Sequence, residues 1–205
     1  MVIDEKLTLL KGEVALVTGA TRGIGKSIAD EFAKAGAMVI GTATTKEGAE
    51  NISNRLSSTD LDGHGIVLDV ASTEQISETI KTLKQSDLMP SILVNNAGMV
   101  AGQGGKPIWE ISDSEWRNVI DANLPGSFYC ARAISQHMIE RGSGKIINVS
   151  SGFGLRGGRD NYMYASSKGG VIQLTRALAT SLGRYGVTSN CLVPGIFLSL
   201  IHISE

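Results

Sequence analysis

The chain has 205 residues, of which 42% are hydrophobic and 19% charged, and its formal net charge is −1. This length suits one domain with a full core, and the near-neutral charge offers no electrostatic footprint for nucleic acid or an acidic membrane surface. The acidic start, MVIDEKLTLLKGE, is not a signal peptide, and no run reaches the about 20 apolar residues that a membrane helix needs.

The cysteines and histidines show no ligand or pairing pattern. Cys130 and Cys191 lie in apolar surroundings without partner spacing, so we expect buried thiols rather than a disulfide or a nucleophile. His64, His137 and His202 are far apart, so we predict no metal site. These features indicate a reducing, cytoplasmic setting.

Apolar runs alternate with amphipathic stretches along the chain. We expect strands at 13–18, 37–43, 65–70, 91–96, 144–150 and 187–193, and helices at 24–35, 46–57, 73–86, 112–139 and 162–185. The strand centres are continuously apolar, as parallel strands covered on both faces must be. The alternation predicts an α/β fold, a doubly wound (Rossmann) parallel sheet with helices on both faces. Such sheets bind ligands at the carboxyl ends of their strands.

The first strand is followed by TGATRGIG, residues 18–25. Its glycines, Gly19, Gly23 and Gly25, permit a tight turn and a close approach of the backbone to a ligand. The helix that follows presents unpaired N–H groups at its N-terminus, which suit a pyrophosphate. A glycine-rich turn alone is weak evidence, but its place between a buried strand and a helix favours a dinucleotide site.

The end of the second strand bears on which dinucleotide is bound. A carboxylate there would hold a ribose 2′-hydroxyl, but the chain reads Gly-Thr-Ala-Thr at 41–44. Arg22, in the glycine loop, and Thr44 would suit a 2′-phosphate instead. We therefore expect NADP(H) rather than NAD(H); the alternative is that Arg22 points into solvent.

The segment YMYASSK, residues 162–168, contains two tyrosines and a lysine on a predicted helix. Tyr164 and Lys168 are four residues apart and share a face, whereas Tyr162 lies on the opposite side. A free phenol has a pKa of about 10, and a neighbouring ammonium favours the phenolate. Tyr164 is thus the candidate proton donor, although a Tyr–Lys pair on a surface helix is common by itself.

Together these motifs resemble the short-chain dehydrogenase/reductase family. The family's order is matched by TGATRGIG, Asn-Asn-Ala-Gly at 95–98, Asn123 in DANLPGSF, Ser151, the Tyr164–Lys168 pair and Pro194-Gly195. The resemblance covers residues 13 to about 197. Through VIGTAT (39–44) and the glycine loop, the chain is most similar to 3-oxoacyl-[acyl-carrier-protein] reductases.

The resemblance implies a role for each matched residue. Tyr164 would be the general acid, Ser151 would bind the substrate oxygen, and Lys168 would also bind the nicotinamide ribose. Asn123 would kink its helix, with Pro125, and hold a water linked to the lysine. The implied cofactor site comprises Gly19, Thr21, Arg22, Gly23, Ile24, Gly25, Thr44, Asp69, Val70, Asn95, Ala97, Gly98, Tyr164, Lys168, Pro194, Gly195 and Ile196. Asp69 could equally be a turn-forming residue.

The resemblance also implies a carbonyl or alcohol substrate, with a 3-oxoacyl thioester, free or on an acyl-carrier protein, as the best choice. Two features depart from typical carrier-protein reductases: the Gly-rich segment 99–112, and Tyr185 in place of a basic residue. A dehydrogenase of small ketones, sugars or cyclic alcohols is the alternative, and a non-catalytic nucleotide-binding regulator is a second one. The family's pattern implies a homo-oligomer, a dimer or tetramer.

The last eight residues, LSLIHISE (198–205), do not continue the family's pattern. They equal the in-frame translation of a transposase mosaic-end sequencing adapter, so we interpret them as a non-native tail. Residues 1–197 would then be one nucleotide-binding domain that lacks the family's C-terminal strand and helix. On this interpretation the activity belongs to a full-length parent, and the chain as written could be inactive.

Overall fold

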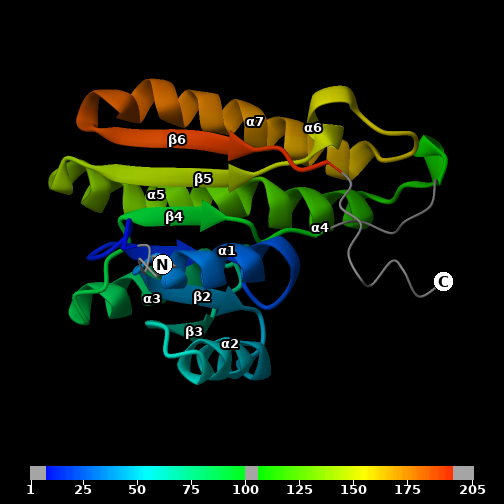
Figure 1. The fold of residues 1–205 in the computed structure, drawn as a ribbon. Coiled ribbons are helices and arrows are strands. Elements are labelled where there is room, and N and C mark those ends of the chain that lie inside the picture. The colour runs from blue at the N-terminus through cyan, green and yellow to red at the C-terminus, as the bar shows by residue number, and fades with distance from the viewer. Residues whose placement is uncertain (1–7, 100–105, 196–205) are drawn as a thin grey trace, which may run out of the picture.

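The computed structural model describes residues 8–99 and 106–195. Its centre is a parallel sheet of six strands in the order β3-β2-β1-β4-β5-β6, and Figure 1 shows them stacked from β3 at the bottom to β6 at the top. The strands are β1 (Val14–Val17), β2 (Met38–Ala43), β3 (Gly63–Val67), β4 (Ile92–Asn95), β5 (Gly144–Val149) and β6 (Val187–Leu192). The order reverses between β1 and β4, which is where ligands bind in such sheets.

Helices cover both faces of the sheet. They are α1 (Gly23–Lys34), α2 (Lys46–Ser58), α3 (Thr73–Gln85), α4 (Asp113–Asn123), α5 (Pro125–Arg141), α6 (Gly152–Arg156) and α7 (Tyr162–Leu182), with short 3-10 turns η1 (Ile108–Glu110) and η2 (Gly183–Tyr185). Along β1, Ala15 and Val17 pack with α1 and α2, whereas Leu16 packs with α3 and α5. This alternation of side chains produces two apolar cores, one on each face. The expected doubly wound α/β fold is confirmed.

The structure differs from the sequence prediction most clearly in three places. The third strand covers Gly63–Val67 instead of 65–70, although Leu68 and Val70 beyond it are buried. The helix expected at 112–139 is two helices, because Pro125 has no backbone N–H and begins a new helix after Leu124. The short helix α6, directly after β5, was not predicted.

Within the described ranges, no helix has the length and apolar character needed to cross a membrane.

Candidate functional site

A cavity of about 1000 Å³ opens at the carboxyl ends of the strands. Its wall is formed by the loop after β1, the start of α2, the ends of β4 and β5, one face of α7 and the segment after β6. The wall contains most of the residues singled out from the sequence: Gly19, Thr21, Arg22, Gly23, Ile24, Gly25, Thr44, Ala97, Gly98, Ser151, Tyr164, Lys168, Pro194 and Gly195. Motifs distributed over the whole chain therefore meet in one place.

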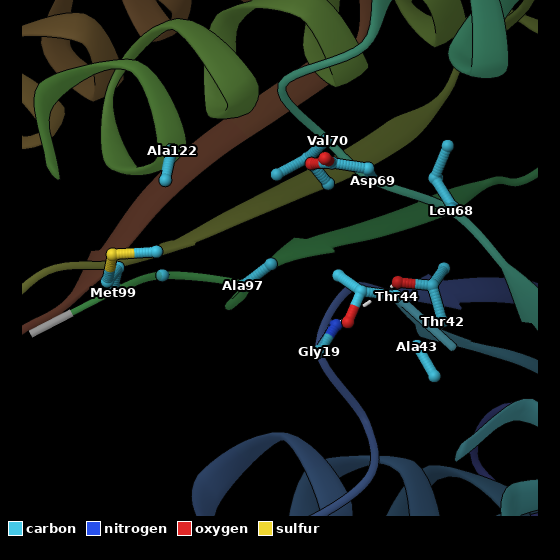
Figure 2. Close-up of a pocket in the computed structure, with 11 residues that line it drawn as sticks. Gly19, Thr42, Ala43, Thr44, Leu68, Asp69, Val70, Ala97, Met99 and Ala122 are labelled. Carbon is cyan, nitrogen blue, oxygen red and sulfur yellow. Dashed lines mark hydrogen bonds between the residues drawn. The ribbon is translucent and has the colours of Figure 1, made fainter. Parts of the chain in front are cut away.

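A second pocket, of about 210 Å³, adjoins the first and shares with it Gly19, Ala43, Thr44, Ala97 and Gly98. Figure 2 shows Asp69 and Val70 above this pocket and Thr44 below it. The Asp69 carboxylate also accepts a hydrogen bond of 2.9 Å from the Ala71 N–H. Asp69 thus stabilises a turn and also lines the pocket, while its contact with a cofactor stays a prediction.

The glycine loop is held tightly against the end of β4. The Asn96 side chain donates hydrogen bonds to the carbonyl oxygens of Thr18 (2.9 Å) and Gly19 (3.0 Å). A Cβ at Gly25 would lie 2.2 Å from the Gly19 carbonyl oxygen, so only glycine fits where α1 begins. The backbones of the loop and of α1 can therefore pack directly against one another.

The same loop suits an anionic ligand. Gly23 has a φ of +57°, and a Cβ placed there would meet nothing within 4 Å, which leaves the backbone open to the cavity. The first turn of α1 contains no acidic residue that would repel a phosphate. The partial positive charge of the helix N-terminus is therefore not neutralised.

Helix α7 supplies two of the candidate reactive side chains. Tyr164 and Lys168 both line the cavity, and the Lys168 Nζ lies 5.7 Å from the centroid of the Tyr164 ring. The Tyr162 hydroxyl instead donates a hydrogen bond of 3.2 Å to Asp160, and Tyr162 is not among the residues of the cavity wall. The two tyrosines differ as the helical spacing predicts.

Lys168 is 5% exposed, and its ammonium donates a hydrogen bond of 2.8 Å to the Val149 carbonyl. Desolvation lowers the pKa of Lys168 from 10.5 to about 8, against an opposing charge effect of Cys191. The backbone of Lys168 is also fixed, because the Ser150 hydroxyl donates to its carbonyl at 2.7 Å. Ser150 thus anchors α7 through its side chain.

Ser151 occupies the junction between β5 and α6. It is the N-cap residue of α6, and its hydroxyl accepts a hydrogen bond of 3.3 Å from the Phe153 N–H. Ser151 is half-buried and belongs to the cavity wall together with Tyr164 and Lys168. Three groups that can exchange protons or donate hydrogen bonds thus share one cavity with the glycine loop.

Comparison with known proteins agrees with this geometry. The family model for short chain dehydrogenase matches residues 13–204. The chain belongs to the short-chain dehydrogenase family. It is 40% identical over 186 residues, 91% of this chain and 74% of the relative, to the 3-oxoacyl-[acyl-carrier-protein] reductase FabG of Pseudomonas aeruginosa. The protein of the same name from Vibrio harveyi is 39% identical over 186 residues, again 91% of this chain and 74% of the relative.

A solved structure of a gluconate 5-dehydrogenase from Burkholderia cenocepacia J2315, in complex with NADP and tartrate, has a TM-score of 0.88. It is 32% identical and is matched over 98% of this chain and 78% of its own. As a short-chain dehydrogenase, the protein is an oxidoreductase that acts on CH–OH groups with a nicotinamide cofactor.

Two asparagines of the short-chain dehydrogenase pattern lie outside the cavity wall. Asn123 is fully buried: its Oδ1 accepts from the Met99 N–H (2.7 Å), and its Nδ2 donates to the Met99 carbonyl (3.0 Å) and the Ser167 hydroxyl (2.9 Å). These contacts position the chain at Met99, and a water-mediated link to Lys168 stays a prediction. Asn95 is 3% exposed and donates to Asn148 at 2.8 Å.

The cavity of this short-chain dehydrogenase also contains residues that the sequence did not reveal. Asn96, next to the predicted Asn95, lines the cavity, as do Thr45, Glu47, Gly48 and Asn51 from the start of α2. The sequence did contain one signal for the α2 residues: this helix follows directly after the second strand, whose carboxyl end lies at the site. Ile196, the remaining predicted cofactor residue, and the tail at 198–205 lie outside the described residues.

Proposed function

We propose that the protein is an NADP(H)-dependent carbonyl reductase whose favoured substrate is a 3-oxoacyl thioester. The observation that carries the proposal is the presence of Tyr164, Lys168 and Ser151 in the same cavity as the glycine loop. A protein that only binds nucleotides has no use for a tyrosine beside a buried ammonium. The carbonyl substrate, free or bound to an acyl-carrier protein, would enter at the side of this cavity that Ser151 lines.

The choice of NADP(H) rests on the charges around the end of β2. Arg22 is exposed, makes no side-chain cap for α1 and lines the cavity together with Thr44. Its guanidinium is free to contact a 2′-phosphate, for which its planar donor set is well suited. Glu47 also lines the cavity and opposes this preference, so Arg22 has to outweigh one carboxylate.

In the proposed reaction, three side chains of the protein have separate roles in proton transfer and hydrogen bonding. When bound, the nicotinamide supplies the hydride that reduces the carbonyl carbon. The Tyr164 hydroxyl donates its proton to the carbonyl oxygen, and the Ser151 hydroxyl donates a hydrogen bond to the same oxygen. Lys168 holds a positive charge beside the Tyr164 ring, which stabilises the phenolate left after proton transfer.

A sugar acid is the second candidate substrate. The observation that favours it is the solved relative named gluconate 5-dehydrogenase, which was crystallised with tartrate. Here Arg156 lines a small pocket together with Ser151 and Phe153, so a cation is available for a carboxylate at the substrate side. The thioester remains the first choice because the curated relatives at 39–40% identity are 3-oxoacyl-[acyl-carrier-protein] reductases.

We also infer that the protein forms a homo-oligomer, a dimer or tetramer. Trp116 on α4 and Phe128 on α5 are each 41% exposed, and a second copy would cover such aromatic surface. Analytical ultracentrifugation tests this inference, which a monomer at micromolar concentration would contradict.

The substrate is tested by following NADPH absorbance with an acetoacetyl thioester, with a panel of small ketones, and with gluconate and NADP⁺ in the oxidative direction. We expect turnover with the thioester and a lower KM for NADPH than for NADH. Turnover with gluconate alone would establish the second candidate. Binding of NADPH without turnover on any compound would favour a nucleotide-binding regulator.

A further inference from the structure

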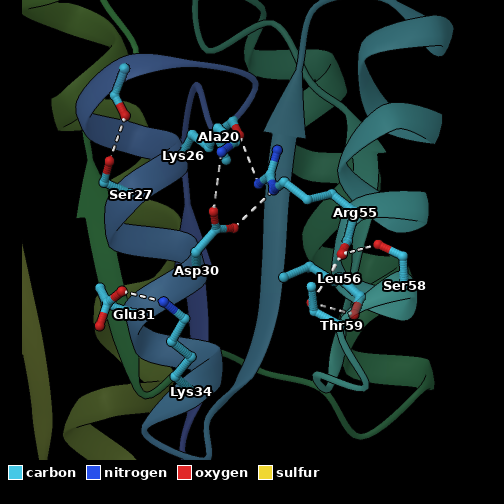
Figure 3. A network of polar contacts seen from close by, with 11 residues as sticks. Ala20, Lys26, Ser27, Asp30, Glu31, Lys34, Arg55, Leu56, Ser58 and Thr59 are labelled. Carbon is cyan, nitrogen blue, oxygen red and sulfur yellow. Dashed lines mark hydrogen bonds and ion pairs between the residues drawn. The ribbon is translucent and has the colours of Figure 1, made fainter. Parts of the chain in front are cut away.

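The carbonyl group of Ala20, in the middle of the glycine loop, has a partner from a distant helix. Ala20 is fully buried, and its N–H donates a hydrogen bond of 2.9 Å to the Thr42 carbonyl of β2. Its own carbonyl accepts a hydrogen bond of 3.2 Å from the Arg55 guanidinium, which reaches over from α2. Figure 3 shows this contact between the loop and the two helices beside it.

The Arg55 guanidinium is itself held in one orientation. Its Nε donates to the Asp30 carboxylate of α1 at 2.8 Å, and Lys26 lies 3.5 Å from the other oxygen of that carboxylate. The side chains of Arg55 and Asp30 are 19% and 21% exposed, so solvent screens their pairing only in part. Because the guanidinium is planar and rigid, the charge-assisted bond from its Nε restricts the direction of the Nη2 donor that binds Ala20.

The orientation of the Ala20 carbonyl determines that of the next N–H. No cis peptide bond occurs in the described chain, and the two groups of a trans peptide point in opposite directions. With the Ala20 carbonyl turned toward Arg55, the Thr21 N–H points away from that buried contact. Thr21 lines the cavity, and its N–H donates to none of the described residues.

The neighbouring peptides follow the same arrangement. The carbonyl oxygens of Thr18 and Gly19 both accept hydrogen bonds from Asn96, so the three successive carbonyls of residues 18–20 each have a donor in the protein. A carbonyl turned into the cavity would instead repel a phosphate. Asn96 controls the first two of these groups and Arg55 controls the third.

We propose that Arg55 is a positioning residue for the pyrophosphate-binding loop. It acts through the Ala20 carbonyl and keeps the 20–21 peptide in the orientation that presents an N–H to the dinucleotide. The inference rests on the proposed function, since it assumes that this loop binds a dinucleotide. Arg55 itself is not among the residues of the cavity wall, which separates its role from that of Arg22.

Geometry and charge can be distinguished by the choice of substitution. Arg55→Met removes both the donor and the charge, whereas Arg55→Lys keeps the charge and loses the fork that bridges two acceptors. Arg176→Met is the matched control, because Arg176 is exposed on α7 and its guanidinium contacts only Gln173 among the described residues. Asp30→Asn is a milder variant that loosens the partner of Arg55.

Each protein is titrated with NADPH and with adenosine 2′-monophosphate, which has the 2′-phosphate but no pyrophosphate. We expect Arg55→Met to weaken NADPH binding about tenfold and Arg176→Met to leave it unchanged. Arg55→Lys should stay about fivefold weaker than wild type, and Asp30→Asn about threefold weaker. Binding of adenosine 2′-monophosphate should change by less than about twofold in all four variants.

Unchanged NADPH affinity in Arg55→Met, an equal loss for both ligands, or full recovery with Arg55→Lys would each overturn the inference. Where Arg55→Met does not fold, Asp30→Asn decides, and wild-type affinity in that variant overturns it as well. A wild-type protein that binds no dinucleotide would refute the proposed function and this inference together. Wild-type binding with unaffected variants would remove only the role of Arg55.

Discussion

The two tyrosines in the first turn of α7 provide a matched test of the proposed proton donor. Tyr164→Phe removes the phenolic hydroxyl of the tyrosine that lines the cavity with Lys168, so we expect kcat to fall by about 100-fold or more. Tyr162→Phe removes a hydroxyl bound to Asp160, and burial together with that hydrogen bond raises the pKa of Tyr162. Steady-state NADPH oxidation should therefore be unaffected by the second substitution.

The comparison requires that both variants bind NADPH as tightly as the wild type, which a fluorescence titration establishes. Wild-type turnover by Tyr164→Phe, or an equal loss in both variants, would rule out Tyr164 as the donor.

The buried ammonium of Lys168 predicts a pH-dependent stability. Because desolvation lowers its pKa from 10.5 to about 8, the folded chain binds this proton less tightly than the unfolded chain. The free energy of unfolding should then increase as the pH rises from about 8 to 10.5, by on the order of 3 kcal/mol from this residue.

Urea unfolding of the wild type and of Lys168→Met at several pH values measures this contribution. Other groups titrate in the same range, so the quantity of interest is the difference between the two proteins. A difference that stays constant between pH 8 and pH 10 would show that Lys168 keeps its ordinary pKa in the folded state.

At the scale of elements, the contact between α6 and α7 couples Ser151 to Lys168. A Cβ at Gly154 of α6 would lie 2.7 Å from the Lys168 carbonyl carbon. Gly154→Ala should therefore push the helices apart, lowering the free energy of unfolding by about 2 kcal/mol and reducing kcat/KM. Gly183→Ala is the control, since a Cβ there meets nothing within 4 Å and φ is −54°.

The control should be neutral or stabilising by up to about 1 kcal/mol, because alanine restricts the unfolded chain. Wild-type kcat/KM in Gly154→Ala would mean that the spacing of the two helices does not determine the geometry of the reactive groups.

The elements that the sequence predicted best are those with the strongest local signal. Strand centres such as 15–17 and 92–94 are apolar on both faces, and the structure buries them completely. The third strand was misplaced because Gly63 and Gly65 have no side chain to signal a strand. A Cβ at Gly65 would lie 2.0 Å from the Ala49 carbonyl oxygen, so the closeness of α2 requires glycine. This requirement for glycine comes from the packing of α2 on the strand, which the local sequence of the strand does not reveal.

The candidate site shows the same division. The spacing of Tyr164 and Lys168 is a property of one helix and could be predicted from the sequence. The choice between the adjacent Asn95 and Asn96 was not, because it depends on Asn148 in the neighbouring strand, which draws Asn95 into the core. Likewise, the contribution of Gly48 and Asn51 to the cavity depends on how α2 packs against the loop.

At the scale of the whole molecule, the cavity joins the two halves of the sheet. The glycine loop and α2 belong to the β1–β3 half, whereas Ser151 and α7 belong to the β4–β6 half. A dinucleotide that contacts both walls binds only when the halves are correctly packed. Because such a ligand has no site in the unfolded chain, its binding must stabilise the entire fold.

Thermal unfolding with added dinucleotide therefore reports both assembly of the site and cofactor preference. At a concentration of about 100 times its Kd, a ligand adds about 2.7 kcal/mol to the free energy of unfolding and raises the Tm. At equal concentrations we expect NADPH to raise the Tm more than NADH, because only NADPH offers Arg22 a 2′-phosphate. Arg22→Met should remove that difference while leaving the effect of NADH intact. An equal increase of the Tm with both cofactors in the wild type would contradict the NADP(H) preference. If Arg22→Met lost the response to both cofactors, Arg22 would instead be needed for the structure of the loop and not for contact with the 2′-phosphate.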